Sequence, residues 1–111
     1  MVSPEFLFRG LSDATRLRCL LLLRAEGRLC VCELVHALEL SQPRISRHLA
    51  QLRDMGIVEC ERHGQWVYYG LHPDLPDWAL DVLDAAARAD SLAPLRERLA
   101  AMPDRPLAYC E

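Results

Sequence analysis

Residues 41–56 read SQPRISRHLAQLRDMG, and this stretch decides the fold that the sequence predicts. Ser41 is a favoured helix N-cap, and Pro43 falls in the opening turn, where its missing N–H costs no hydrogen bond. Three apolar residues at helical spacing form one stripe: Ile45, Leu49 and Leu52. The stretch therefore predicts a helix with a buried stripe and a polar, arginine-bearing outer face that ends at Gly56.

The segments on either side of this helix predict a DNA-binding architecture. Upstream, residues 32–38 have the apolar spacing of a short helix, and two helices joined by a tight turn make a helix-turn-helix. Downstream, residues 57–62 and 65–71 alternate in polarity and predict two strands joined at His63-Gly64. A β-hairpin that follows a helix-turn-helix is the wing of a winged helix.

Four further helices are expected outside this core motif. A helix over residues 4–9 ends at Gly10, and a second, capped by Ser12 or Asp13, runs to about Glu26 and ends at Gly27. Two more are expected over residues 77–89 and 94–102. The predicted fold class is mainly α with a β-hairpin, a winged helix-turn-helix in the order ααααββαα. It forms one domain over residues 1–111, with 102–111 as a flexible tail.

Composition limits the classes of function. Of the 111 residues 51% are apolar, yet no apolar run is long enough to cross a membrane and the first ten residues lack a signal-peptide pattern. We therefore expect a cytoplasmic protein without a membrane partner. The net charge of −3 looks unsuited to nucleic acid, but residues 41–73 carry four arginines against three acids. Local charge, rather than the total, governs DNA affinity.

The cysteines suggest a ligand. Five cysteines are an odd set without disulfide-framework spacing, and cytosolic thiols stay reduced. Cys19 lies within an apolar helical pattern and is interpreted as a core residue. Cys30 and Cys32, separated by one residue, form a thiol pair that suits a soft, thiophilic ion.

Four segments together resemble the ArsR/SmtB family of metalloregulatory repressors, and most closely its arsenical-responsive branch. They are LSDATRL at 11–17, LCVCEL at 29–34, SQPRISRHL at 41–49 and GQWVYY at 64–69. The resemblance implies a homodimer that binds a double-stranded operator and represses an arsenic-resistance operon. It also implies release from the operator when trivalent arsenic or antimony binds the cysteine thiolates of Cys30 and Cys32.

The spacing of the thiol pair restricts its geometry. Side chains at i and i+2 of a regular α-helix point about 200° apart, so both sulfurs cannot face one ion from such a helix. Either Cys30 lies in extended chain before the helix, or ion binding unwinds the start of the helix. In the second case the ion itself would distort the helix that precedes residues 41–55.

The identity of a third ligand stays open. Trivalent arsenic prefers three sulfurs, and the family's arsenite sensors with this motif place a third cysteine where this chain has Val35. Cys110 in the tail is the first candidate for the third sulfur, and Cys60 in the predicted hairpin is a weaker one. Alternatively two thiols suffice, with a small third ligand or with a methylated or aryl trivalent arsenical as the inducer.

The sequence also suits other kinds of DNA-binding protein, including a DNA-binding module without an inducer. A Cd-, Pb- or Zn-responsive repressor of the same family could use His36 to complete a sulfur and nitrogen site. The family's zinc site between C-terminal helices is not expected, because residues 77–90 contain no histidine. A thiol redox-sensing repressor could use the same cysteines. An enzyme is not expected, since no nucleophile elbow, phosphate loop or paired-carboxylate pattern occurs, and no catalytic residue is assigned.

The predicted DNA contacts follow from the helix-turn-helix. The first turns of a recognition helix enter the major groove, and the wing contacts the minor groove or phosphates. The candidates are Gln42, Arg44, Ser46, Arg47 and His48 on the helix, and Arg62, His63 and Gln65 in the wing. Dimerisation through residues 4–9 and the alanine-rich 77–89 predicts an inverted-repeat operator with half-sites about one turn apart.

Overall fold

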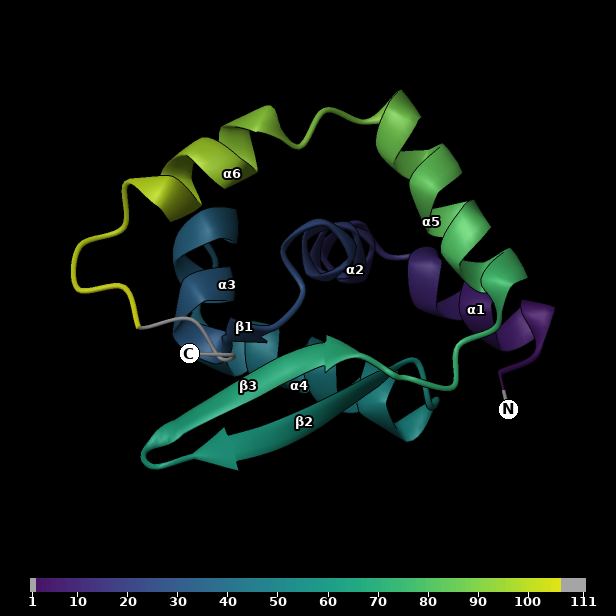
Figure 1. Ribbon diagram of the computed structural model, residues 1–111, viewed down its shortest axis with the longest axis horizontal. Coiled ribbons are helices and arrows are strands. Elements are labelled where there is room, and N and C mark those ends of the chain that lie inside the picture. The colour runs from purple at the N-terminus through teal and green to yellow at the C-terminus, as the bar shows by residue number, and fades with distance from the viewer. Residues whose placement is uncertain (1, 107–111) are drawn as a thin grey trace.

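The computed structural model describes residues 2–106, and it contains the predicted winged helix (Figure 1). In chain order the elements are α1 (Pro4–Leu11), α2 (Ala14–Glu26), β1 (Leu29–Cys30), α3 (Val31–Leu38), α4 (Gln42–Asp54), β2 (Val58–His63), β3 (Trp66–Leu71), α5 (Asp77–Ala89) and α6 (Ala93–Ala100). The predicted order of helices and hairpin is confirmed, with one addition, the short strand β1.

The helix boundaries follow from local capping. Asp13 caps α2 by accepting hydrogen bonds from the backbone N–H groups of Thr15 and Arg16 at 2.8 and 3.1 Å. Gly27 ends the helix with a φ of +92°, a conformation that L side chains rarely adopt. Ser41 caps α4, as expected. The bounds of α5 agree with the prediction, whereas α6 ends at Ala100, two residues earlier than expected.

Helix α2 lies at the centre of the molecule, with α1, α3, α4, α5 and β3 packed around it (Figure 1). The periodicity of its sequence predicts one buried face, but the structure buries five consecutive residues, Cys19 to Leu23. A helix surrounded by other elements has no solvent face along its middle, so its apolar pattern is continuous there. The thiol of Cys19 belongs to this core, as predicted.

The recognition helix α4 packs as its sequence predicts. Its three stripe residues, Ile45, Leu49 and Leu52, are fully buried. The turn from α3 into α4 uses a left-handed conformation at Glu39, whose φ is +58°. These contacts fix α4 beneath α2 and leave its opposite face in solvent.

The sheet has three antiparallel strands in the order β1-β3-β2. The hairpin partners run from Val58↔Leu71 to His63↔Trp66, so the turn falls at Gly64-Gln65, one residue later than predicted. The first strand pairs Leu29 with Tyr69 and Cys30 with Tyr68. The cysteine segment is thereby hydrogen-bonded to the wing. In the described residues no helix is long and apolar enough to cross a membrane.

Candidate inducer site and DNA interface

The two thiols of the predicted site lie side by side at the start of α3. Cys30 is the N-cap residue, with extended backbone angles of −73° and 153°, and the helix begins at Val31. The Sγ atoms of Cys30 and Cys32 are 3.0 Å apart. The spacing left two geometries open, and the structure has the one in which Cys30 lies in extended chain before the helix. Because Cys30 leaves the helical path, both sulfurs share one side without any unwinding.

Glu33 holds Cys30 in this conformation. It occupies the third position of α3, and its Oε1 accepts the backbone N–H of Cys30 at 2.7 Å. An acidic side chain that reaches back to the N-cap N–H is half of a capping box. The same carboxylate accepts a hydrogen bond from Arg105 Nε at 2.5 Å, although its side chain is only 5% exposed. The backbone of the thiol site is therefore tied to the segment that follows α6.

The surroundings keep the thiol of Cys32 protonated. Burial raises its pKa to about 12, and the hydrogen bond with Cys30, together with the charges of Cys30 and Glu33, acts in the same direction. Burial also raises the pKa of the core thiol Cys19 to about 12. Cys32 can therefore meet a ligand as a neutral thiol that gives up its proton on binding.

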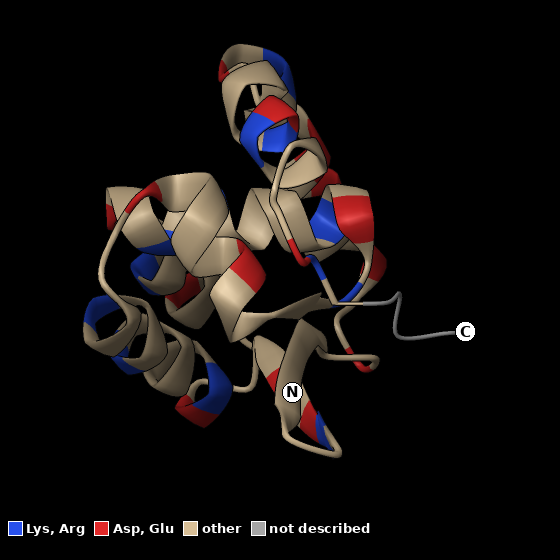
Figure 2. Cartoon of the chain, turned by 90° about the vertical axis from the view of Figure 1, so that its left-hand side faces the viewer, with Lys and Arg blue, Asp and Glu red and all other residues tan. Residues whose placement is uncertain are grey.

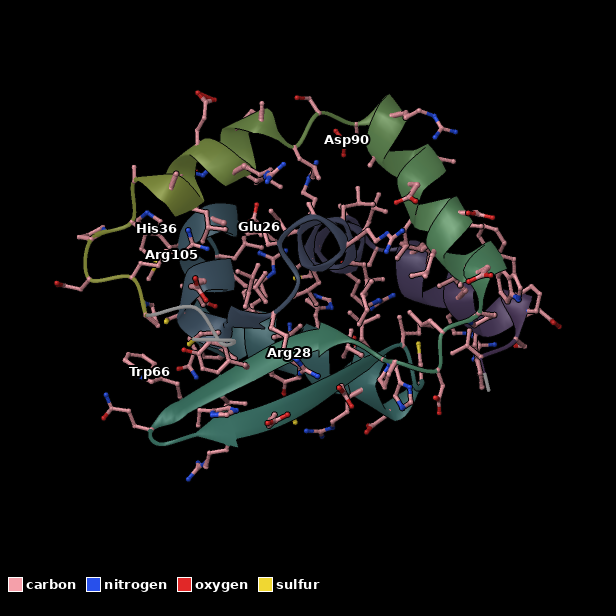
Figure 3. The ribbon with its side chains drawn as sticks, in the orientation of Figure 1. Glu26, Arg28, His36, Trp66, Asp90 and Arg105 are labelled. Atoms are coloured by element: carbon pink, nitrogen blue, oxygen red, sulfur yellow. The ribbon has the colours of Figure 1, made fainter. Side chains whose placement is uncertain are left out.

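The described residues do not supply a third ligand. Between Val2 and Pro106 no group of three or more His, Cys, Asp or Glu side chains is arranged to hold a metal ion. His36, considered for a zinc site, lies on α3 (Figure 3) but joins no such group. Cys60 is exposed on β2, opposite Tyr69 of β3. Cys110, the first candidate for a third sulfur, lies outside the described residues.

The predicted recognition residues occupy two different environments. Gln42, Arg44 and Arg47 are exposed, and Ser46 is half-buried. His48 differs, because its side chain is only 12% exposed and its Nδ1 lies 3.4 Å from Nη1 of Arg16 in α2. A base contact by His48 stays a prediction, and in the isolated chain its ring packs against α2.

The wing residues lie at the end of the hairpin. Arg62, His63 and Gln65 are all exposed, and His63 Nε2 is 2.9 Å from Glu61 Oε2. Figure 2 shows an acidic and a basic position next to each other on the hairpin, and mixed charges over the helices. Trp66 is exposed at the start of β3 (Figure 3), whereas the next two aromatic residues, Tyr68 and Tyr69, are buried and brace the sheet.

Three residues of the site were missed by the sequence reasoning: Arg16, Glu33 and Arg105. The position of Glu33, three residues after an N-cap, is a recognised capping signal and could have been found. Arg16 lies in a quoted segment of resemblance, but its partners in α4 are more than 30 residues away. Nothing local indicates that Arg105 pairs with a residue 72 positions earlier.

Comparisons with known proteins agree with this architecture. Residues 13–59 match the family described as bacterial regulatory protein, arsR family. The chain is 54% identical over 108 residues to "Arsenic resistance transcriptional regulator ArsR1" of Pseudomonas putida, covering 96% of this chain and 84% of that protein. It is 49% identical over 87 residues to "Arsenical resistance operon repressor" of Escherichia coli, covering 78% and 74%.

A solved structure shares the fold. The antimony-specific transcriptional repressor AntR superimposes with a TM-score of 0.65 at 30% identity, covering 75% of this chain and 72% of that one. Proteins of this family are transcriptional regulators and not enzymes. Close similarity along nearly the whole chain, a matching family segment and a shared winged-helix fold lead to one conclusion: this chain belongs to the arsR family of bacterial regulatory proteins.

Proposed function

We propose that the protein is a DNA-binding repressor of an arsenic-resistance operon, and that trivalent arsenic or antimony releases it from its operator by binding Cys30 and Cys32. The observation that carries the proposal is the 3.0 Å contact between the two sulfurs at the first turn of the helix-turn-helix. The names of the relatives, which refer to arsenic, arsenical resistance and antimony, support the choice of ion.

The chemistry is ligand exchange without a change of oxidation state. Arsenous acid, As(OH)₃, reacts with two thiols; two As–S bonds form, two As–O bonds break, and each departing hydroxide takes a thiol proton and leaves as water. A third thiol would displace the last hydroxide in the same way, and Cys110 is proposed for that role. Inorganic arsenite is the proposed inducer, since the relatives described above are named for arsenic and arsenical resistance.

The proposed coupling uses two connections that leave the thiol site. Cys30 begins α3, which leads through the turn at Glu39 into the recognition helix. Cys30 also pairs with Tyr68 in β3, the inner strand of the wing. Arsenic that binds both sulfurs fixes the backbone of residues 30–32, and any shift there moves the recognition helix and the wing relative to each other. Coupling of about 1–3 kcal/mol would lower operator affinity about 5- to 150-fold.

The DNA-binding form is proposed to be a homodimer in the cytoplasm on an inverted-repeat operator. Phe6 and Phe8 on α1 are 42% and 55% exposed, so this helix presents large apolar side chains to solvent. Close packing of a second copy against α1 and the alanine-rich α5 would cover them. Two-fold symmetry then presents two recognition helices to successive major grooves, the arrangement that an inverted repeat matches.

The experiment is operator binding by fluorescence anisotropy, with DNA from upstream of the chain's own gene, in the presence of arsenite, antimonite, Cd²⁺, Zn²⁺ or peroxide. Release by arsenite and antimonite supports the proposal. Release by Cd²⁺ or Zn²⁺ alone would assign the chain to the divalent-metal sensors. Release by peroxide alone would favour a redox sensor that joins the neighbouring sulfurs in a disulfide.

Single substitutions test the contribution of each cysteine separately. Cys30→Ser and Cys32→Ser should bind the operator normally and no longer respond to arsenite. Cys60→Ser tests the weaker candidate for a third sulfur: its thiol is exposed on the hairpin, and we expect the response to arsenite to be unchanged. Cys110→Ser tests the third ligand through the number of As–S bonds seen by X-ray absorption. Normal arsenite release from Cys30→Ser and Cys32→Ser would contradict the proposal.

A further inference from the structure

One buried carboxylate, that of Glu33, joins two parts of the chain. Oε1 of Glu33 accepts the Cys30 backbone N–H at 2.7 Å, and Oε2 accepts Nε of Arg105 at 2.5 Å. The first bond belongs to the thiol site, and the second comes from beyond α6. Figure 3 shows Arg105 beside α3, on the same side of the molecule as Glu26 at the end of α2.

We propose that Arg105 is a positioning residue of the inducer site: by holding Glu33 from the segment after α6, it fixes the Cys30 backbone in the conformation that places the two sulfurs together. This inference rests on the function proposed above and assigns a regulatory role to the segment after α6. A residue of this kind contacts neither the thiols nor the ion.

The physical basis is the isolation of the Glu33 carboxylate. The side chain is 5% exposed, and a carboxylate removed from water is unstable unless charge and hydrogen bonds compensate it. Within residues 2–106, the Glu33 carboxylate forms its ion pair with Arg105. Without that charge, the carboxylate gains by turning toward solvent, and the Cys30 N–H then loses its acceptor.

Without that acceptor, the backbone of Cys30 can leave the extended conformation that ligand binding requires. Cys30 must keep its extended backbone for both sulfurs to face the same side, because a helical Cys30 would point its sulfur away from that of Cys32. The bond from Glu33 restrains this backbone directly. Arg105 therefore acts on the thiol pair through one intermediate residue.

The chain contains a matched control nearby. Arg96 Nε on α6 pairs with Glu26 Oε2 at 2.6 Å, which also joins the C-terminal region to the first half of the chain. This pair does not include Glu33, although its Glu26 also lies 3.9 Å from Nη2 of Arg105 through Oε1. Loss of either Arg96 or Arg105 removes one guanidinium charge and one contact between the C-terminal region and the first half of the chain. Only loss of Arg105 should disturb the thiol pair.

The first measurement is arsenite affinity, from the ultraviolet absorption of As–S bonds, for the full chain and for Arg105→Ala, Arg105→Lys and Arg96→Ala. Outer partners that orient ligand residues typically change affinity 10- to 100-fold when removed. We expect about tenfold weaker arsenite binding for Arg105→Ala, partial recovery in Arg105→Lys, and no change in Arg96→Ala. Operator affinity without arsenite should be the same in Arg96→Ala as in the unmodified chain.

The second measurement does not involve arsenic. Hydrogen exchange of the Cys30 amide, followed by NMR, should be several-fold faster in Arg105→Ala than in the unmodified chain or in Arg96→Ala, with Arg105→Lys between them. If the unmodified chain fails to bind arsenite, the proposed function fails, while the exchange rates still test the role of Arg105. Equal Cys30 exchange in Arg105→Ala and the unmodified chain would overturn the inference, as would equal losses in Arg96→Ala and Arg105→Ala.

Discussion

Arg16 of α2 donates a hydrogen bond from Nη1 to Oε1 of Gln51 in the recognition helix at 2.9 Å. The same guanidinium donates to the carbonyl oxygens of Gly10 and Arg9 at 3.0 and 3.2 Å, at the end of α1. One side chain thus joins α1, α2 and α4. It holds α4 against α1 and α2, so DNA affinity should depend on it although it lies on another helix.

Replacement of Arg16 by Ala should lower the free energy of unfolding by about 1–2 kcal/mol, because several charge-assisted hydrogen bonds are lost together. It should also weaken operator binding, since α4 loses its attachment to α1 and α2. Urea denaturation and anisotropy measure the two effects. Arg24→Ala is the control: its pair with Asp84 is exposed, and such pairs contribute about 0–1 kcal/mol. An Arg16→Ala protein as stable and as tight on DNA as Arg24→Ala would refute this role.

Stability should depend on the ionisation of Asp13. The hydrogen bond from the Arg16 backbone N–H is the main cause that lowers the pKa of Asp13 below 3.8, and His48, Thr15 and the Arg16 charge add to it. A group whose pKa is lower in the folded state stabilises the fold above its unfolded pKa and loses that contribution as the pH falls. The contribution is therefore complete at neutral pH and decreases below about pH 4.

Asp13→Ala should cost about 1 kcal/mol at neutral pH, the usual effect of a lost N-cap. Asp13→Asn keeps a capping oxygen and should lie closer to the unmodified chain there. Unfolding in urea from neutral pH to about pH 3 should show the difference between the unmodified chain and Asp13→Asn shrinking as the pH falls. If the difference in unfolding free energy between the two proteins grew toward acid pH, the proposed role of the Asp13 carboxylate would be contradicted.

The exposed arginines of α4 should contribute separately to operator affinity. If Arg44 or Arg47 contacts a phosphate, its replacement by Ala weakens binding to all sequences and reduces the salt slope of log K by about 1. If it contacts a base, the loss is about 1–3 kcal/mol and is confined to the specific operator. Titrations at several salt concentrations, with operator and scrambled DNA, distinguish the two roles. Arg96→Ala should change neither quantity, and unchanged binding by both α4 variants would remove this helix from the DNA interface.

The pH dependence of ligand binding should separate arsenic from divalent ions. Cys32, with a pKa of about 12, carries its proton at neutral pH. Exchange with arsenous acid uses that proton to release water, so arsenite affinity should change little around neutral pH. Cd²⁺ cannot take up the proton, so its affinity should rise by about tenfold per pH unit for each proton released. Isothermal titration in buffers of different ionisation enthalpy counts these protons, and a steep rise of arsenite affinity with pH would contradict the exchange chemistry.

Local signals in the sequence were enough for most of the fold. Ser41, Pro43 and the stripe that begins at Ile45 predicted α4, and alternation predicted the hairpin to within one residue. The same signals failed for β1, since two residues are too few for a periodic pattern. They also underestimated how much of α2 is buried: Leu22 and Leu23 are buried because other elements cover both sides of the helix.

By itself the sequence determined the winged helix, the position of the thiol pair and the exposed arginines of α4, because caps, periodicity and residue chemistry act over a few neighbouring positions. The tertiary structure decided how those thiols are held: Cys30 pairs with Tyr68 of the wing, and Glu33 pairs with Arg105. Those partners are tens of residues apart in the chain. Their meeting depends on how α2, α3 and α6 pack, and such packing is a property of the whole core rather than of any one segment.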